Sequence, residues 1–247
     1  MSLLTPMLRS SPLTDWFSDA QRVQGMLDFE AALAQAQAAC GMVPTAAVGP
    51  IVAACRHEAI DFTALGEAAG GAGNLAIPLV KQLTAQAKAR DPDAARYVHW
   101  GATSQDAIDT GLVLQLRGAL DAAERLLERL LAALAGQADR YRDTVMPGRT
   151  WMQHALPVTF GLKLAGTLDA LLRWQQRLRE MRPRLLVLQF GGAAGTLDAL
   201  KEKVDTFTPP HISELIDYKA LIQNFEWHFL YQSCGISADF PEQLCLI

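Results

Sequence analysis

The chain of 247 residues is poor in several features that mark specialised proteins. It holds four cysteines, too few for the disulfide framework of a small secreted domain. No C-x-x-C or H-E-x-x-H spacing occurs, so we expect no metal site and no cofactor. No apolar run approaches the roughly 20 residues that span a bilayer, and the first residues do not resemble a secretory signal. We therefore expect a soluble, cytoplasmic protein with reduced thiols.

An excess of positive charge is also missing. The chain has 22 Lys and Arg against 26 Asp and Glu, a formal net charge of −4. Nucleic-acid-binding proteins usually carry a strong basic excess, so we expect no nucleic-acid partner. Half of the residues are hydrophobic, which is enough for a sizeable core.

The composition changes sharply near residue 200. Residues 1–200 contain 37 Ala and 16 Arg, whereas residues 201–247 contain 2 Ala and no Arg. These last 47 residues also hold 7 of the 18 aromatic residues. We expect a tail of separate origin: a small module, a fusion or the product of a shifted reading frame. Apolar residues at helical spacing over 212–231 predict one amphipathic helix in it.

Strand-like alternation is absent as well, and the first 200 residues predict an all-α fold. Apolar residues return every three or four positions along five stretches. The predicted helices cover residues 14–40, 46–58, 78–90, 105–142 and 157–189. Pro157 would lie in the first turn of the last helix, and Pro183 would kink it or end it early. Helices as long as the last two need long neighbours, so we expect a bundle with further helices from this chain or from other subunits.

Polar residues cluster directly before the longest predicted helix, in the segment VHWGATSQD at 98–106. Thr103 and Asp106 have the spacing of a capping box, and Ser104 is a good N-cap. Exposed N–H groups and hydroxyls at a helix start also bind anions. His99 beside such a start indicates a functional site, and a well-capped helix without function is the alternative.

A second cluster, GRTWMQHALP at 148–157, precedes the other long helix. Arg149, Thr150, Gln153 and His154 gather a guanidinium, a hydroxyl, an amide and an imidazole in one loop. Arginine pairs with carboxylates through two parallel hydrogen bonds, and histidine moves protons near neutral pH. This combination predicts a carboxylate-binding, proton-transferring site. The alternative is a polar loop with a buried, hydrogen-bonded His154.

Two glycine-rich stretches, at 69–74 and 191–196, complete the motifs. Both lack the Gly-Lys-Ser/Thr ending of a phosphate-binding loop. We interpret them as helix ends.

Four segments resemble the fumarase/aspartase superfamily. HWGATSQDAIDT (99–110) and GRTWMQHALPVTFG (148–161) are similar to two of its signature regions. Its amino-terminal domain is similar to LDFEAALAQAQAACGMVP (27–44) and GNLAIPLVK (73–81). Trp151 and the run at 182–200 resemble one branch, the bacterial 3-carboxy-cis,cis-muconate cycloisomerases of protocatechuate breakdown.

The resemblance implies an all-α fold assembled as a homotetramer. A small helical amino-terminal domain would cover residues 1–104, and residues 105–200 would form part of a central bundle of long helices. Active sites in the superfamily combine segments from three subunits. The cycloisomerase branch adds a carboxylate oxygen across a conjugated double bond and a proton to the neighbouring carbon, which gives a muconolactone.

The resemblance also implies which residues bind the small polycarboxylate substrate. Addition next to a carboxylate passes through an enolate-like species, which needs preplaced hydrogen-bond donors rather than a metal. Thr103, Ser104 and the helix that follows would supply them. The further residues expected to contact substrate are Asn74, Arg149, Thr150, Trp151 and Gln153.

Three residues are the candidates for the catalytic step: His99, Ser104 and His154. An imidazole with a pKa near 6.5 can donate or relay the proton. Many superfamily members carry an acid–base histidine where this chain has Trp151, and His154 would substitute for it here.

One signature of the superfamily, the Gly-Ser-Ser-x-x-Met-Pro-x-Lys-x-Asn loop with the catalytic serine, is not found in the sequence. We therefore expect this chain to be the amino-terminal part of a cycloisomerase, catalytically incomplete by itself. Two alternatives stay open. One is a lyase of the argininosuccinate or adenylosuccinate type, against which Trp151 weighs. The other is a helical oligomerisation module without catalysis.

Overall fold

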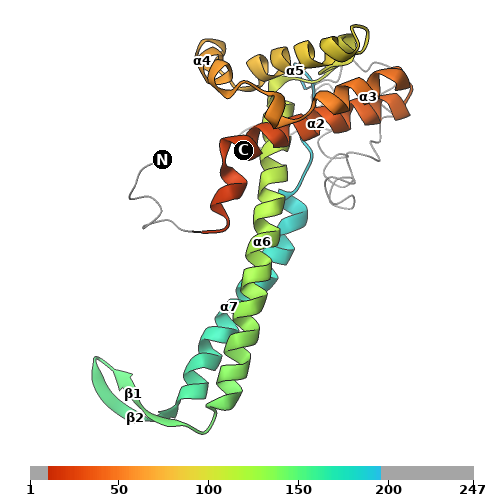
Figure 1. The fold of residues 1–247 in the computed structure, drawn as a ribbon. Helices are drawn as coiled ribbons and strands as arrows, with labels where there is room; N and C mark the ends of the chain where they lie inside the picture. Colours follow the sequence, from red (N-terminus) through yellow and green to blue (C-terminus); the bar gives the residue numbers. More distant parts are fainter. Residues whose placement is uncertain (1–10, 196–247) are drawn as a thin grey trace, which may run out of the picture. The chain divides into compact units, whose positions relative to one another are not determined.

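The computed structural model describes residues 11–195, and all their regular elements except one β-hairpin are helical (Figure 1). The α-helices are α2 (Asp19–Ala39), α3 (Thr45–Ala54), α4 (Phe62–Ala72), α5 (Ala76–Arg90), α6 (Ser104–Arg140) and α7 (Phe160–Leu185). The strands are β1 (Val145–Thr150) and β2 (Gln153–Thr159). Three short 3-10 helices are η1 (Thr14–Phe17), η2 (His57–Ala59) and η3 (Ala94–Tyr97).

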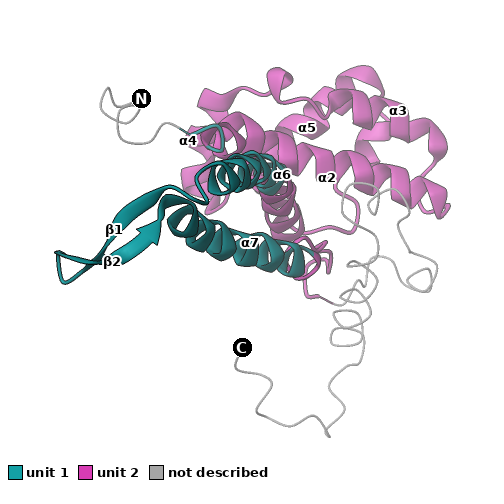
Figure 2. Ribbon diagram, turned by 90° about the horizontal axis from the view of Figure 1, so that it is seen from below, with its two compact units in different colours: residues 1–13, 118–182 teal, residues 14–117, 183–247 magenta. Residues whose placement is uncertain are grey.

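The described residues form two compact units (Figure 2). Residues 14–117 and 183–195 make up one, here called the core unit, and residues 11–13 and 118–182 make up the other, the hairpin unit. The boundary between them lies within α6. The predicted division at residues 104 and 200 stays a prediction.

Helix α2 carries the centre of the core unit. It begins after Ser18, whose hydroxyl accepts a hydrogen bond from the N–H of Gln21. The large side chains that it buries most completely, each at most 2% exposed, are Met26, Leu27, Phe29 and Leu33. Each such burial contributes roughly 1.5–3 kcal/mol. The alanines among them are small enough to let neighbouring helices pack closely against α2.

Helices α2 and α6 approach each other closely in the core unit. A Cβ placed on Gly25 would lie 2.6 Å from the carbonyl oxygen of Gly111, and one on Gly111 would lie 2.9 Å from the nitrogen of Met26. Both obstacles are backbone atoms, which cannot rotate out of the way. Only glycines therefore fit at this crossing, and they fix the start of α6 against α2.

The sequence analysis does not predict α4. The carboxylate of Asp61 caps its start by accepting the N–H groups of Thr63 and Ala64, both at 3.0 Å. The helix ends at Gly73, which has a φ of 76°. Three internal glycines lower its helix propensity, and its only buried residue is Leu65, so the sequence shows no apolar stripe there.

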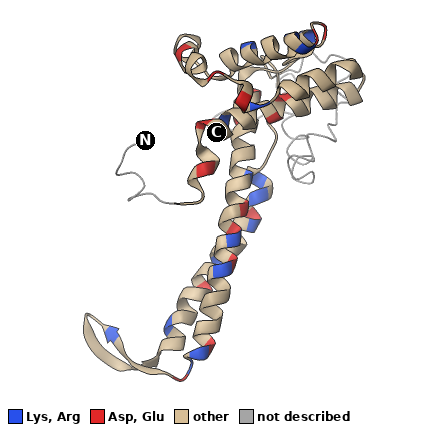
Figure 3. Ribbon diagram, in the orientation of Figure 1, with Lys and Arg blue, Asp and Glu red and all other residues tan. Residues whose placement is uncertain are grey.

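In the hairpin unit, ion pairs join α7 to α6. Arg179 lies 3.1 Å from Glu124 and 3.8 Å from Glu128, and Arg182 pairs with Asp121. Figure 3 shows positive and negative residues following one another along the two helices. Pairs that are partly exposed contribute about 0–1 kcal/mol each. These ion pairs therefore add little to the stability of the helix pair.

Two predictions for residues 145–160 are wrong. The sequence analysis finds no strand there and begins the last helix at Pro157, whereas the structure has an antiparallel hairpin and begins α7 at Phe160. Pro147 faces Pro157 across the ribbon, where both strands are edges and tolerate a missing N–H. The loop is Trp151–Met152, with both φ angles positive. Such a turn is usually marked by Asn-Gly, so its sequence signal is missing.

The other long-helix predictions are confirmed. The segments 14–40, 46–58, 78–90 and 105–142 correspond to η1 with α2, to α3, to α5 and to α6, with ends that differ by a few residues. Pro183 lies in the last turn of α7, which ends at Leu185, as predicted for an early stop.

Two further observations bear on the other predictions. Within residues 11–195, no helix has both the length and the apolarity to cross a membrane. The predicted helix at 212–231 and the rest of the tail lie outside the described residues.

The helix crossing predicts the effect of adding one methyl group. We expect Gly25→Ala to lower the free energy of unfolding by about 1–3 kcal/mol, because the new Cβ overlaps the backbone of Gly111. Gly49→Ala, at an exposed position of α3 with no atom within 4 Å, should raise it by about 0.5–1 kcal/mol. Urea unfolding measures both, and equal stability of the two variants would contradict the tight crossing.

Candidate functional site

A cleft of about 380 Å³ lies at the amino-terminal end of α6 in the core unit, here called the first cleft. Its walls come from α5, from the turn at residue 99 and from the start of α6. The lining residues are Ala76, Ile77, Val80, Lys81, His99, Ala102, Thr103 and Ser104. The structure therefore brings together three predicted site residues. Lys81, which ends the quoted segment GNLAIPLVK, joins them and was missed as a site residue.

The start of α6 gives this cleft the character of an anion site. The helix begins at Ser104, so Thr103 holds the cap position and the prediction of Ser104 as N-cap is wrong. The N–H of Thr103 donates to Asp106 at 2.9 Å, the return bond of the predicted capping box. The remaining N–H groups of the first turn carry partial positive charge, and Lys81 adds a full one. This polarity suits a carboxylate.

Asp106 joins the start of α6 to the second glycine-rich stretch. Its side chain is 1% exposed and accepts the N–H of Gly191 at 2.9 Å and of Gly192 at 3.0 Å, besides that of Thr103. Burial raises the pKa of this carboxyl, and the three N–H donors and the nearby His99 partly offset the rise. The second glycine-rich stretch follows the end of α7. The backbone N–H groups of two of its glycines donate to Asp106 and so hold in place the carboxylate that caps α6.

His99 is held in place by α2. Its Nδ1 lies 2.5 Å from Oε1 of Glu30, whose side chain is 2% exposed. Burial lowers the pKa of His99, but the hydrogen bond and charge of Glu30, with the charge of Asp106, outweigh it, so the pKa is raised. Gln37 donates to the carbonyl of Trp100 at 2.6 Å. These bonds hold His99 at a φ of 59°, a left-handed conformation that is strained outside glycine.

Five of the other predicted residues lie on the hairpin. Arg149 pairs with His154 across the ribbon, and Thr150 pairs with Gln153. Neighbouring pairs point to opposite faces, so the ribbon carries the guanidinium and imidazole on one face and the hydroxyl and amide on the other. Trp151 lies in the two-residue loop and is 90% exposed. His154 is also exposed, so the alternative of a buried His154 is wrong.

Arg149 lines a second cleft, of about 370 Å³, between the hairpin and the first turn of α7. Lys163 lies in the same wall, and the lining contains no carboxylate. Gly148 shapes it at the irregularity of β1, because a Cβ there would lie 2.6 Å from the carbonyl oxygen of Leu156. The side chains of Arg149 and Lys163 are positively charged, and no carboxylate in the lining neutralises them. The cleft is therefore suited to a carboxylate ligand. Sequence analysis missed Lys163, which lies outside both quoted clusters.

Asn74 lines neither of these clefts. Its side-chain oxygen accepts the N–H of Ile77 at 3.0 Å and so caps the start of α5, the helix that carries Ile77 and Lys81 into the first cleft. Its expected contact with substrate stays a prediction.

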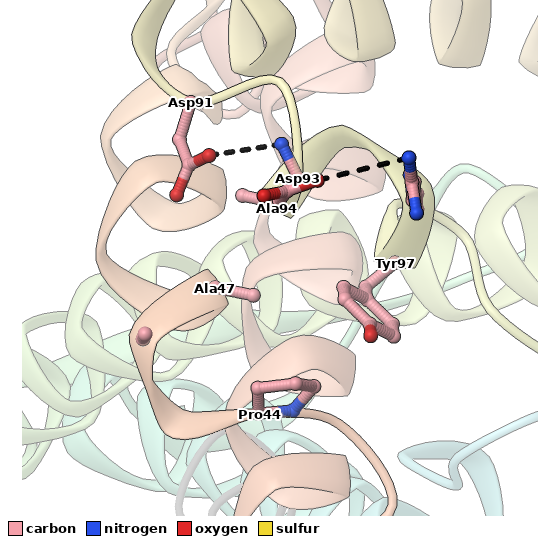
Figure 4. Close-up of a pocket in the computed structure, with 8 residues that line it drawn as sticks. Pro44, Ala47, Asp91, Asp93, Ala94 and Tyr97 are labelled. Carbon is pink, nitrogen blue, oxygen red and sulfur yellow. Dashed lines mark hydrogen bonds and ion pairs between the residues drawn. The ribbon is translucent and has the colours of Figure 1, made fainter.

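A third cleft, of about 320 Å³, lies between α3 and η3 and contains no predicted site residue (Figure 4). Asp91 accepts the N–H of Asp93 at 2.9 Å, and Asp93 pairs with Arg96 at 3.8 Å. The charged side chains of this cleft thus already interact with neighbouring residues of the cleft itself. In the part of the chain that the structure describes, no three His, Cys, Asp or Glu side chains gather as a metal ion would require.

The family model for lyases matches residues 8–222, a stretch that includes every predicted site residue. This chain belongs to the lyase family. Membership in this lyase family confirms the resemblance stated from the signature segments and the helical fold that it implied.

Two relatives within the lyase family carry the same name. The 3-carboxy-cis,cis-muconate cycloisomerase of Pseudomonas aeruginosa is 63% identical over 194 residues, which are 78% of this chain and 42% of the relative. The cycloisomerase of the same name from Bradyrhizobium diazoefficiens is 55% identical over 201 residues, 81% of this chain and 45% of the relative. A crystal structure of 3-carboxy-cis,cis-muconate lactonizing enzyme from Pseudomonas putida is 54% identical, with a TM-score of 0.82 over 87% of this chain and 49% of that one.

The match to these lyases is partial in length. The chain spans less than half the length of the curated relatives that it matches. The similarity of the solved structure confirms the fumarase/aspartase type of fold in this lyase. The roles of the individual site residues stay predictions.

The cap at Asp106 predicts a destabilised variant. Asp106→Asn replaces one acceptor oxygen by an NH₂ group, which faces at least one of the three N–H groups that the carboxylate now satisfies. We expect a loss of about 1–3 kcal/mol in the free energy of unfolding, measured in urea. Asp109→Asn on the same helix is the control, because within residues 11–195 Asp109 accepts a hydrogen bond only from the exposed side chain of Gln105. If Asp106→Asn lowers the free energy of unfolding no more than Asp109→Asn does, the capping role of Asp106 is wrong.

Proposed function

We propose that this chain supplies part of an enzyme that converts 3-carboxy-cis,cis-muconate to a carboxymuconolactone in the cytoplasm, during the breakdown of protocatechuate. The observation that carries the proposal is the 63% identity to a relative named for this reaction. The clefts support it, because one combines a helix start with Lys81 and the other combines Arg149 with Lys163. A substrate with three carboxylates needs such groups.

In the proposed reaction, a carboxylate oxygen forms a C–O bond to one carbon of the conjugated diene. The neighbouring carbon gains a proton, and negative charge builds up on the carboxylate beside it before protonation. Thr103, Ser104 and the N–H groups of α6 would stabilise that charge. In an assembly whose active sites combine segments of different subunits, Arg149 and Lys163 of another copy would hold a further carboxylate. The proton would come from an imidazole, of His99 or of His154.

We also propose that the enzyme is a homo-oligomer. Several large apolar side chains of the hairpin unit are 40% to 56% exposed: Leu126, Leu130, Leu172 and Trp174. Apolar surface of this kind usually marks an interface. The superfamily resemblance implies a homotetramer with active sites that combine segments of three subunits. Four copies of the chain would cover the exposed leucines with one another.

Substrate binding tests the function directly. We expect calorimetry to show binding of 3-carboxy-cis,cis-muconate to the purified chain, and no binding of argininosuccinate or adenylosuccinate. Loss of the diene ultraviolet absorbance in the same sample reports turnover. Binding of argininosuccinate or adenylosuccinate alone would favour the alternative lyase. A folded oligomer that binds none of the three would favour the non-catalytic module and contradict the proposal.

Arg149 provides a sharper version of this test. We expect Arg149→Ala to weaken binding of 3-carboxy-cis,cis-muconate by about 10-fold to 100-fold, the effect of one lost charge-assisted pair. Arg142→Ala is the matched control, because Arg142 pairs with Asp139 and Asp143 and lines no cleft described above. Equal affinities of the two variants, measured by calorimetry, would remove Arg149 from the binding site.

A further inference from the structure

The proposed reaction does not use the buried carboxylate of Glu30. This residue is 3% exposed in the middle of α2, and its Oε1 lies 2.5 Å from Nδ1 of His99. Its second oxygen, Oε2, is buried and has no hydrogen-bond partner among residues 11–195. A carboxylate in such a place costs several kcal/mol unless a positive charge accompanies it. The described partner that can carry this charge is the imidazole of His99.

The geometry of His99 leaves one ring nitrogen for the first cleft. Nδ1 is committed to Glu30, and Nε2 lies on the opposite edge of the ring and makes no hydrogen bond within the described residues. The side chain is 18% exposed and lines the cleft with Lys81, Thr103 and Ser104. A neutral ring that donates Nδ1–H to Glu30 offers Nε2 only as an acceptor. A protonated ring offers Nε2–H as a charged donor.

We propose that Glu30 is a positioning residue, which holds His99 as an imidazolium whose Nε2–H binds a carboxylate of the substrate in the first cleft. The charge on His99 follows from its contact with Glu30, and only the identity of the carboxylate rests on the proposed function. The charged groups around the ring are Glu30 and Asp106, which favour the imidazolium, and Lys81 in the cleft wall, which opposes it. The pairing also explains the strained backbone at His99. Glu30 holds the ring of His99 and Gln37 holds the carbonyl of the next residue, Trp100, so the ring cannot relax away from the cleft.

Titration of the histidines by NMR tests the charged pair without any turnover. In the full chain labelled with ¹⁵N-histidine, with the signal of His99 assigned from His99→Gln, we expect His99 to titrate above the ordinary value of about 6.5. Glu30→Gln should lower that pKa by roughly one unit or more. Glu58→Gln is the matched control, because Glu58 is 69% exposed and lies 3.6 Å from Nδ1 of His57. It should leave the pKa of His99 unchanged, since Glu58 lies beside His57 and not beside His99.

Propane-1,2,3-tricarboxylate, which has no double bond to react, tests the ligand. Its binding should raise the pKa of His99 further in the wild-type chain and less in Glu30→Gln. Titration of His99 at or below 6.5 in the wild-type chain would overturn the charged pair, even if Glu30→Gln does not fold. A raised pKa that the tricarboxylate does not change would overturn the carboxylate assignment. Neither result depends on muconate, so a failure here is distinct from a failure of the proposed function.

Discussion

The crossing of α2 and α6 at Gly25 and Gly111 is the constraint on which the first cleft depends. Because two backbones touch there, the start of α6 has one possible position along α2. Glu30 lies little more than one turn beyond Gly25, and Asp106 lies little more than one turn before Gly111. The crossing therefore sets the position of both carboxylates that act on the turn at His99. A larger residue at either glycine would displace the cap and the imidazole together.

Hydrogen bonds of buried polar side chains then hold the wall of the first cleft in one conformation. Glu30 and Gln37 lie two turns apart on a helix that is otherwise apolar on its inner face, and both reach the turn at residues 99–100. Asp106 gathers three N–H groups from two segments. Each group is costly to bury without a partner, so the arrangement tolerates few alternatives. The conformation of the cleft wall is thus specified by hydrogen bonds, on a scaffold that is held together by apolar contacts.

Sequence patterns reveal the parts of this architecture that depend on local signals. The apolar spacing predicts α2 and α6, and the polar cluster before α6 predicts three residues of the first cleft. The hairpin is missed because Trp151 and Met152 occupy a turn that glycine and asparagine usually mark. Glu30 as a partner of His99, and Asp106 as a partner of Gly191, are missed for a different reason. Their partners lie 69 and 85 residues away in the chain, and no local pattern encodes such contacts.

The pair of His99 and Glu30 also links folding to proton binding. Since the pKa of His99 is higher in the folded chain than the unfolded value of about 6.5, folding takes up a proton in the range between the two values. The stabilisation from the pair is complete below pH 6.5 and is lost as the pH rises through the folded pKa. Above the folded pKa the neutral ring still donates Nδ1–H to Glu30, so the turn keeps its hydrogen bonds to α2 and loses only the charge of the pair and the stability that the charge adds. The proton on His99 that would bind an anion in the first cleft is therefore the same proton that stabilises the folded chain.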